Sequence, residues 1–286
     1  MNTRAELAYL KDRDPLRRIL GRLGVYERVK ASWIYDLYWS LADKRIVDDR
    51  QKEIRFYQNL LEGFRSGDVI FDVGANVGYK VGMFLKMGAT VVAAEPDELN
   101  QAILRQKYLS YHLRKRRLTI VGKAISEESS VQKMWIDEPG SALNTLSNKW
   151  AETLKDDDAR FGRHMGFGEW KEVKATSIEA LIAEHGVPFF IKIDVEGHEL
   201  SVLRGMRQPV PYLSFEVNLP QFRAEGLECV QVLGRLAKDG QFNYSLDCRR
   251  GLAREGWLTK EEISAVLASS ADPSLEVFWR TPLRIR

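Results

Sequence analysis

The sequence contains few cysteines and no long hydrophobic run. Its 286 residues include two cysteines, Cys229 and Cys248. Two isolated cysteines exclude a disulfide framework or a metal cluster, and we interpret them as reduced structural thiols. No apolar run reaches the roughly 18 residues of a membrane-spanning helix. The stretch from Met1 to Lys11 lacks the apolar core of a secretory signal, so we expect a cytoplasmic protein with no transmembrane segment.

The chain also lacks a strong excess of charge of either sign. The formal net charge is +3, whereas binding to nucleic acid requires a broad basic surface. We therefore expect no nucleic-acid partner. The hydrophobic and charged fractions, 44% and 29%, are ordinary for a globular protein that buries a sizeable core.

The first 66 residues have a helical pattern and carry no cofactor signal. Apolar and aromatic residues recur there at helical spacing, first around residues 33–41 and again around 54–64. We predict an N-terminal helical extension over residues 1–66. It would pack on the main domain as a helical layer, or serve as a lid or as the surface of a homo-oligomer.

From residue 67 to residue 286, strand patterns alternate with helix patterns. This alternation predicts an α/β fold with a mainly parallel, doubly wound sheet. A polar stretch at about residues 127–172 breaks the rhythm, and we predict that it is a lid or a substrate-binding insertion. The expected strands are 69–73, 90–94, 118–121, 189–193 and 212–217, the expected helices are 77–87, 99–113, 177–185, 199–206 and 229–239, and residues 242–246 and 275–279 form an antiparallel closing pair.

The segment from Val69 to Gly78 is the most informative motif. An apolar strand ends near an acid and turns through two glycines into a helix. A pyrophosphate loop would not place a carboxylate beside the phosphates, whereas a ligand with an ammonium group suits one. S-adenosylmethionine has an ammonium and no phosphate. The predicted cofactor-binding residues of this motif are Asp72, which would hold the ammonium directly or through water, and Gly74, Ala75, Asn76 and Gly78.

Further cofactor contacts are expected after the second and third strands. Glu95 stands at the end of the second strand, where an acid binds ribose hydroxyls in such folds, and Pro96 fixes the turn. Ala124 and Ile125 follow the third strand and either flank the adenine ring or simply pack the loop.

Charged residues lie at the end of the fourth strand. Period-two alternation puts Lys192 and Asp194 on the same face, and a buried lysine needs a partner. Asp194 would face the cofactor's sulfonium or the acceptor hydroxyl. Glu196 and His198 occupy the next loop, and His198 is either a general base or an ordinary loop histidine.

The fifth strand and the insertion supply candidates for substrate binding. Glu216 and Asn218 point to one side, where they could hold a substrate hydroxyl or, with Asp194, a divalent ion; Glu216 could instead pair with Lys192. A divalent metal is compatible with this pattern but is not predicted. Aromatic and amide side chains of the insertion either bind a sugar-like substrate or pack the lid, and they are Trp135, Ser141, Asn144, Trp150 and His164.

At these motifs the chain resembles the FkbM family of S-adenosylmethionine-dependent methyltransferases. The resemblance rests on residues 71–78, Glu95-Pro96 and residues 191–199, and it extends from about residue 68 to residue 218. It implies a class I methyltransferase fold, cofactor binding by Asp72, Gly74, Asn76 and Glu95, and a reaction centre lined by Asp194, Glu196 and His198. Members of the family mostly methylate hydroxyls of sugars or natural products. Lys80 departs from the small or hydroxyl residue expected just inside the helix.

The sequence thus predicts an O-methyltransferase that acts on a small-molecule or glycan hydroxyl by in-line methyl transfer. The alternatives are a non-catalytic cofactor-binding or scaffold protein and a nicotinamide-dependent dehydrogenase. A dehydrogenase loop would carry a glycine where Asn76 stands. A nucleic-acid methyltransferase would need an Asn/Asp-Pro-Pro-aromatic motif after the fourth strand, and that motif is missing.

Overall fold

The computed structural model describes residues 44–114, 116–155 and 165–282, and its centre is a seven-stranded sheet. The strand order is β3-β2-β1-β7-β8-β10-β9. Five strands are parallel, and β10 runs antiparallel to both of its neighbours, β8 and β9. The predicted class I methyltransferase fold, Rossmann-like with an antiparallel closing strand, is confirmed. The strands are β1 (Val69–Val73), β2 (Thr90–Ala94), β3 (Leu118–Val121), β7 (Phe190–Ile193), β8 (Tyr212–Asn218), β9 (Gln241–Ser245) and β10 (Ser274–Arg280).

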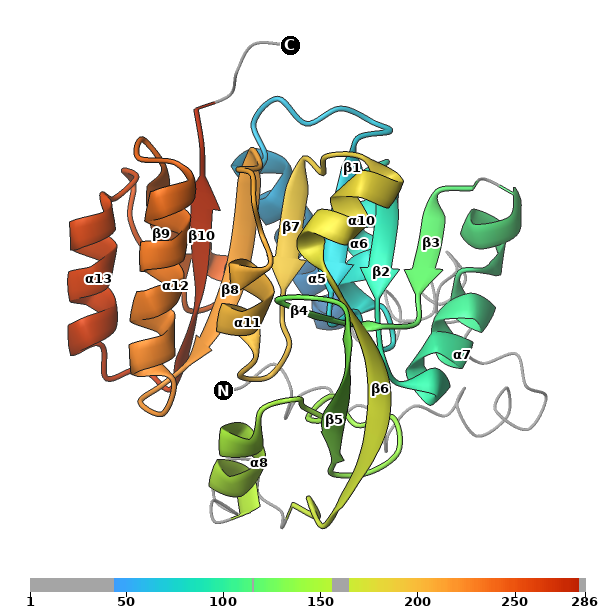
Figure 1. Cartoon of the computed structure of the whole chain (residues 1–286). Helices are drawn as coiled ribbons and strands as arrows, with labels where there is room; N and C mark the ends of the chain where they lie inside the picture. Colours follow the sequence, from blue (N-terminus) through green and yellow to red (C-terminus); the bar gives the residue numbers. More distant parts are fainter. Residues whose placement is uncertain (1–43, 115, 156–164, 283–286) are drawn as a thin grey trace.

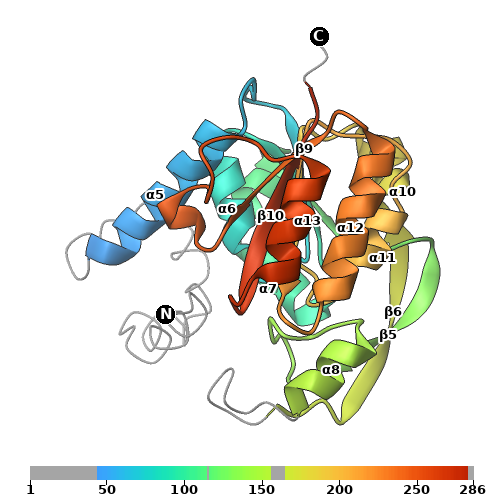
Figure 2. The ribbon, with the colours of Figure 1, turned by 90° about the vertical axis from the view of Figure 1, so that its left-hand side faces the viewer.

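Helices cover both faces of this sheet, as Figures 1 and 2 show. One hydrophobic core lies between the sheet and the helices α10 (Ile178–His185), α11 (Glu199–Arg204), α12 (Arg223–Leu236) and α13 (Lys260–Ser269). A second core lies on the other face, against α5 (Lys44–Leu60), α6 (Tyr79–Lys86) and α7 (Glu98–Lys107). Successive strand residues alternate between the two cores, as expected for a sheet buried on both sides.

The insertion forms a small sheet of its own, in the order β4-β6-β5. Its elements are β4 (Ala124–Ser126), β5 (Ser130–Ile136), α8 (Asn148–Lys155) and β6 (Glu169–Ser177). In Figure 1 the β5–β6 pair and α8 lie below the edge where β1, β2 and β7 end. In a parallel sheet this edge is where ligands bind.

Some predicted boundaries are wrong. The helix expected over 99–113 ends at Lys107 and is followed by a π-helical turn, Ser110–Arg114, while the helix expected from residue 229 starts at Arg223. Helix α13 was not predicted, although Thr259 and Glu262 form a capping box at its start. The short 3₁₀ turn Cys248–Arg250 was not predicted either.

Helix α5 packs on the second core and supplies partners for Lys80, the residue that departs from the type expected just inside α6. The Lys80 ammonium forms an ion pair with Glu53 and a hydrogen bond to the Tyr57 hydroxyl at 3.2 Å, and both partners come from α5. Burial acts to lower the pKa of Lys80, but the charges around it, chiefly Tyr57 and Glu53, hold that pKa well above its usual value. The helical pattern at 54–64 thus belongs to a layer on the main domain. Residues 1–43 of the predicted extension lie outside the described residues.

Among the residues that the structure describes, no helix combines the length and the apolar character needed to cross a bilayer.

Removing Glu53 should destabilise the fold strongly. In Glu53→Ala, Lys80 keeps its burial but loses its carboxylate, and breaking a buried pair in this way costs about 3–5 kcal/mol. The free energy of unfolding in urea measures this loss. Glu228→Ala removes the partner of Arg204 in an exposed pair and should cost less than about 1 kcal/mol. Equal effects of the two substitutions would contradict a structural role for the buried pair.

Candidate functional site

The loop after β1 is shaped by backbone conformation. Gly74 has a φ of +82° and Asn76 a φ of +48°, values that glycine and asparagine tolerate better than other residues. The amides of Gly74 and Ala75 donate to the Ala94 carbonyl at 3.0 and 3.1 Å. A Cβ on Gly74 would overlap the Asp194 carbonyl. The glycine therefore lets the β1 loop lie directly against the chain that leaves β7.

Gly78 shapes the start of α6. Its φ is +79°, and a Cβ there would collide with Leu104 and Tyr108 of the neighbouring helical segment. The Tyr108 hydroxyl donates to the Gly78 carbonyl at 2.6 Å. Neither Gly78 nor the buried Ala75 lines the pocket described below, so the structure shows for both a role in forming the loop, and the cofactor contact predicted for each stays a prediction.

Glu95 is fixed by two backbone amides. One carboxylate oxygen accepts from the Asn76 amide at 2.7 Å and the other from the Asp97 amide at 2.8 Å. Burial raises the pKa of Glu95 to about 7, although these hydrogen bonds act to lower it. The Asn100 side chain also hydrogen-bonds to this carboxylate, which leaves a further lone pair that can accept a hydroxyl donor such as that of a ribose.

One pocket collects most of the predicted site. The space inside it amounts to about 530 Å³ when its open mouth is included. The predicted residues that line it are Gly74, Asn76, Glu95, Pro96, Ala124, Ile125, Ser141, Asn144, Asp194, Glu196 and His198. The remaining lining residues are Ala94, Asn100, Lys123, Met134, Ala142, Leu146 and Val195.

Asp72 does not line this pocket. It is 2% exposed and lies in register with Lys192 on β7, which is itself in register with Ser214 on β8. Residue 72 belongs to the strand rather than the loop, and alternation turns it toward the second core. Burial raises the pKa of Asp72 to about 6 against the opposing effect of Lys192. Its Oδ2 has no hydrogen-bond partner among the described residues. Of the two predicted ways of holding the cofactor's ammonium, directly or through water, this geometry favours the one through water.

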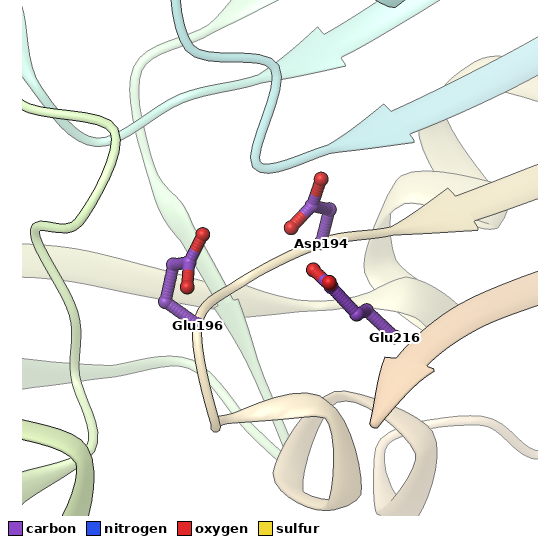
Figure 3. Close-up of side chains that lie close together, drawn as sticks. All are labelled: Asp194, Glu196 and Glu216. Carbon is purple, nitrogen blue, oxygen red and sulfur yellow. The ribbon is translucent and has the colours of Figure 1, made fainter. Parts of the chain in front are cut away.

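Three carboxylates gather at the ends of β7 and β8 (Figure 3). Oxygen atoms of Asp194, Glu196 and Glu216 lie within 4.8 Å of one another. The Lys192 ammonium donates to Asp194 at 3.0 Å, which confirms that these two side chains share a face. Burial, together with the charges of these three acids, raises the pKa of the adjacent Glu199 to about 8. The cluster could hold a divalent cation or accept a proton or a hydroxyl.

Glu196 is held by the insertion. Its φ of +55° is unusual for a residue other than glycine. The Thr145 hydroxyl donates to its carbonyl at 2.6 Å, and Trp150 Nε1 donates to its carboxylate at 3.1 Å. Trp150 is fully buried, so the prediction that it contacts the substrate is wrong. The ring packs under the site, and its single donor is used on Glu196.

His198 lines the pocket, but its basicity differs from the prediction. Burial lowers the pKa of His198 to about 4, so the ring is neutral at pH 7 and a weak base. Its Nε2 lies 3.1 Å from the Ser126 hydroxyl, which also lies 2.9 Å from the Ser201 hydroxyl. The expectation of a pKa near neutrality is corrected, because the loop histidine is largely withdrawn from water.

The other insertion candidates divide into two groups. Ser141 and Asn144 line the pocket; Ser141 donates to Asp137 at 2.9 Å, and the Asn144 amide donates to the Glu138 carbonyl at 3.2 Å. Trp135 packs against the first core and does not line the pocket. His164 lies outside the described residues.

Two residues at the start of α7 lie at the site and were not predicted from the sequence. Asp97 caps the helix by accepting from the amides of Leu99 and Asn100, and it also receives the Lys171 ammonium from the insertion at 3.2 Å. Asn100 is 1% exposed and lines the pocket. The capping position of Asp97 was visible in the sequence, whereas the pairing with Lys171 depends on how the insertion folds back.

Comparison with known proteins places the chain in a family. The model of the methyltransferase FkbM domain matches residues 72–233, more than half of the chain. The chain belongs to the FkbM methyltransferase family. The match begins at the acid of the β1 motif and ends within α12, so it includes every lining residue of the pocket.

Individual relatives are more distant. The 31-O-demethyl-FK506 methyltransferase FkbM of Streptomyces tacrolimicus is 32% identical over 161 residues, which cover 50% of this chain. The chain spans about 60% of that relative's length. A solved FkbM methyltransferase from Methylobacillus flagellatus KT has a TM-score of 0.49 and 17% identity, covering 79% of this chain and 47% of its own. A solved SAM-dependent O-methyltransferase from Thermotoga maritima has a TM-score of 0.39 and 14% identity, covering 82% and 66%.

Trp150→Phe should weaken the fold through Glu196. The substitution keeps most of the ring but removes the indole N–H that donates to the Glu196 carboxylate, at a cost of about 1–3 kcal/mol in the free energy of unfolding. Trp170→Phe, on the exposed side of β6, should change that free energy by less than about 0.5 kcal/mol. Chemical denaturation of both variants measures the difference. A Trp150→Phe protein as stable as the unsubstituted one would contradict the anchoring role.

Proposed function

We propose that this FkbM-family domain binds S-adenosylmethionine in the pocket between the β1 loop and the insertion. The pocket brings together the turn at Gly74, the acidic loop after β7, and Glu95, which stands where an acid binds ribose hydroxyls in such folds. This convergence is the observation that carries the proposal. The ribose hydroxyls would donate to Glu95, and the methionine ammonium would reach Asp72 through water.

The residues present fit that cofactor. A cation suits the Asp72 Oδ2, which is buried without a partner in the described chain. The pocket has apolar side chains for a purine in Pro96, Ile125 and Met134. Its acidic side, with Asp194 and Glu196, matches the positive charge of the sulfonium centre.

We further propose that the domain transfers the methyl group to a hydroxyl of a sugar, glycoconjugate or natural product. When bound, the cofactor supplies an electrophilic methyl on a positively charged sulfur. Held at Glu95 and Asp72, it would supply this methyl for in-line transfer to the acceptor oxygen, with S-adenosylhomocysteine as the leaving group. The pocket residues hold the acceptor oxygen in line with the breaking bond, and much of the rate enhancement comes from such positioning.

The acceptor hydroxyl must lose its proton as the new bond forms. A neutral hydroxyl is a weak nucleophile, so a carboxylate or imidazole within hydrogen-bond reach should take that proton. The pKa of His198, about 4, makes it no stronger a base than an ordinary aspartate, and its Nε2 lies 3.1 Å from the Ser126 hydroxyl. Asp194 lines the pocket and is held by Lys192, so we assign the base to Asp194, with Glu216 beside it. His198 would then orient the acceptor.

Calorimetric titration with S-adenosylhomocysteine tests the cofactor proposal. We expect micromolar binding at pH 8 that weakens roughly tenfold at pH 6. Glu95 has a pKa of about 7; below that pH it is increasingly protonated, and a protonated acid accepts ribose hydroxyls less well.

Two controls belong to this titration. Glu95→Gln should bind more weakly and lose most of the change between pH 8 and pH 6, leaving a smaller part that follows Asp72. NAD should not bind. Binding of NAD in place of S-adenosylhomocysteine would reject the methyltransferase proposal in favour of a dehydrogenase.

Turnover of the variants at positions 194 and 198 separates the two candidate bases. With an accepted hydroxylated substrate, Asp194→Asn should lower kcat by about 10²–10⁴-fold, the usual contribution of a general base. His198→Ala should lower kcat by less than about tenfold. Both variants should keep their affinity for S-adenosylhomocysteine within about threefold. The reverse order of effects on kcat would return the base to His198.

A further inference from the structure

Asn100 carries a buried side-chain oxygen that no described residue hydrogen-bonds. Asn100 lies in the first turns of α7 and is 1% exposed. Its Oδ1 is a buried acceptor without a hydrogen-bond partner among the described residues, and Asn100 lines the pocket. An unpaired buried carbonyl is destabilising, so this atom points to a ligand donor.

The orientation of the amide follows from Glu95. The Asn100 side chain forms a hydrogen bond with the Glu95 carboxyl group and lowers its pKa. A carboxylate only accepts hydrogen bonds, so the amide Nδ2 is the donor. Oδ1 is then the group left for a ligand. Asn100 thus links Glu95 to a second polar position in the same pocket.

A glycine of the insertion lies close to Oδ1. Gly140 has a φ of +74°, and a Cβ built there would lie 3.3 Å from Asn100 Oδ1 and 3.0 Å from a methyl group of Leu99. Apolar side chains line the same pocket, among them Pro96, Ile125 and Met134. A pocket with apolar side chains and an unpaired acceptor, Asn100 Oδ1, suits a flat base that carries an amino group.

We infer that Asn100 is a specificity-determining residue of the cofactor site, whose Oδ1 accepts a hydrogen bond from the 6-amino group of the adenine ring. The inference rests on the proposed binding of S-adenosylmethionine. The loop Gly122-Lys123-Ala124-Ile125 after β3 offers no carboxylate or amide side chain for that amino group, so Asn100 fills this role from the neighbouring helix. The site would reject a base with a 6-oxo group, because two acceptors would then face each other.

The test compares ligands that differ in one group. S-adenosylhomocysteine, its 6-oxo analogue S-inosylhomocysteine and its 2′-deoxy analogue are titrated calorimetrically into the full chain. The unsubstituted protein should prefer the 6-amino ligand over the 6-oxo ligand by about 10–100-fold. In Asn100→Leu this ratio should fall below about threefold, while the penalty for the 2′-deoxy ligand stays unchanged.

Two further variants complete the test. Asn100→Asp keeps an acceptor at the same place and should retain the preference for the 6-amino ligand, although its absolute affinity falls beside Glu95. Gln101→Leu makes a comparable change one residue away, outside the pocket lining, and should leave every ratio unchanged. If Asn100→Leu fails to fold, Asn100→Ala replaces it.

The outcomes separate this inference from the proposed function. A 6-amino preference that survives in Asn100→Leu would overturn the role of Asn100 while leaving the cofactor in place. Loss of the 2′-deoxy penalty instead would mean that Asn100 contacts the ribose, which also overturns the inference. Failure of the unsubstituted protein to bind S-adenosylhomocysteine would overturn the proposed cofactor itself.

Discussion

The site depends on the close approach of two backbone segments, Gly74 in the β1 loop and the carbonyl of Asp194 after β7. These strands are neighbours in the sheet, and their paired residues run from Ile70 with Phe190 to Val73 with Ile193. The two chains therefore leave the sheet side by side, and any Cβ at position 74 would force them apart. Because they stay together, the glycine loop, Glu95 and the acidic loop share one pocket.

Behind this pocket, the buried charged side chains need neighbours of opposite charge. Asp72 and Lys192 lie in register on the face of the sheet that α5 and α6 cover. On the same face, the charges of Lys192 and Lys80 lower the pKa of Glu276 against the effect of its burial. Lys80 is matched in turn by Glu53 of α5. An uncompensated charge here would be costly, so α5 completes the electrostatics of the layer that supports Asp194.

Much of the fold and part of the site follow from local sequence signals. Buried parallel strands are continuous apolar runs bounded by turns, so β1, β2 and β3 could be predicted to the residue, and Glu95 follows from its position after β2. The role of Trp150 could not be predicted in this way, because a tryptophan in a polar insertion has the same sequence signature whether it faces a substrate or a buried carboxylate. The low pKa of His198 could not be predicted either, because the burial of this loop side chain depends on how the insertion folds over it.

The insertion is therefore better understood as a wall of the pocket than as a separate lid. On one side Lys171 forms an ion pair with Asp97, two residues after Glu95. On the other side Thr145 and Trp150 hold the carbonyl and the carboxylate of Glu196. Swinging the insertion away would break these contacts together, at about 1–3 kcal/mol for each. A substrate that enters the pocket therefore passes the insertion, which is held in place by contacts with the same residues that shape the reaction centre.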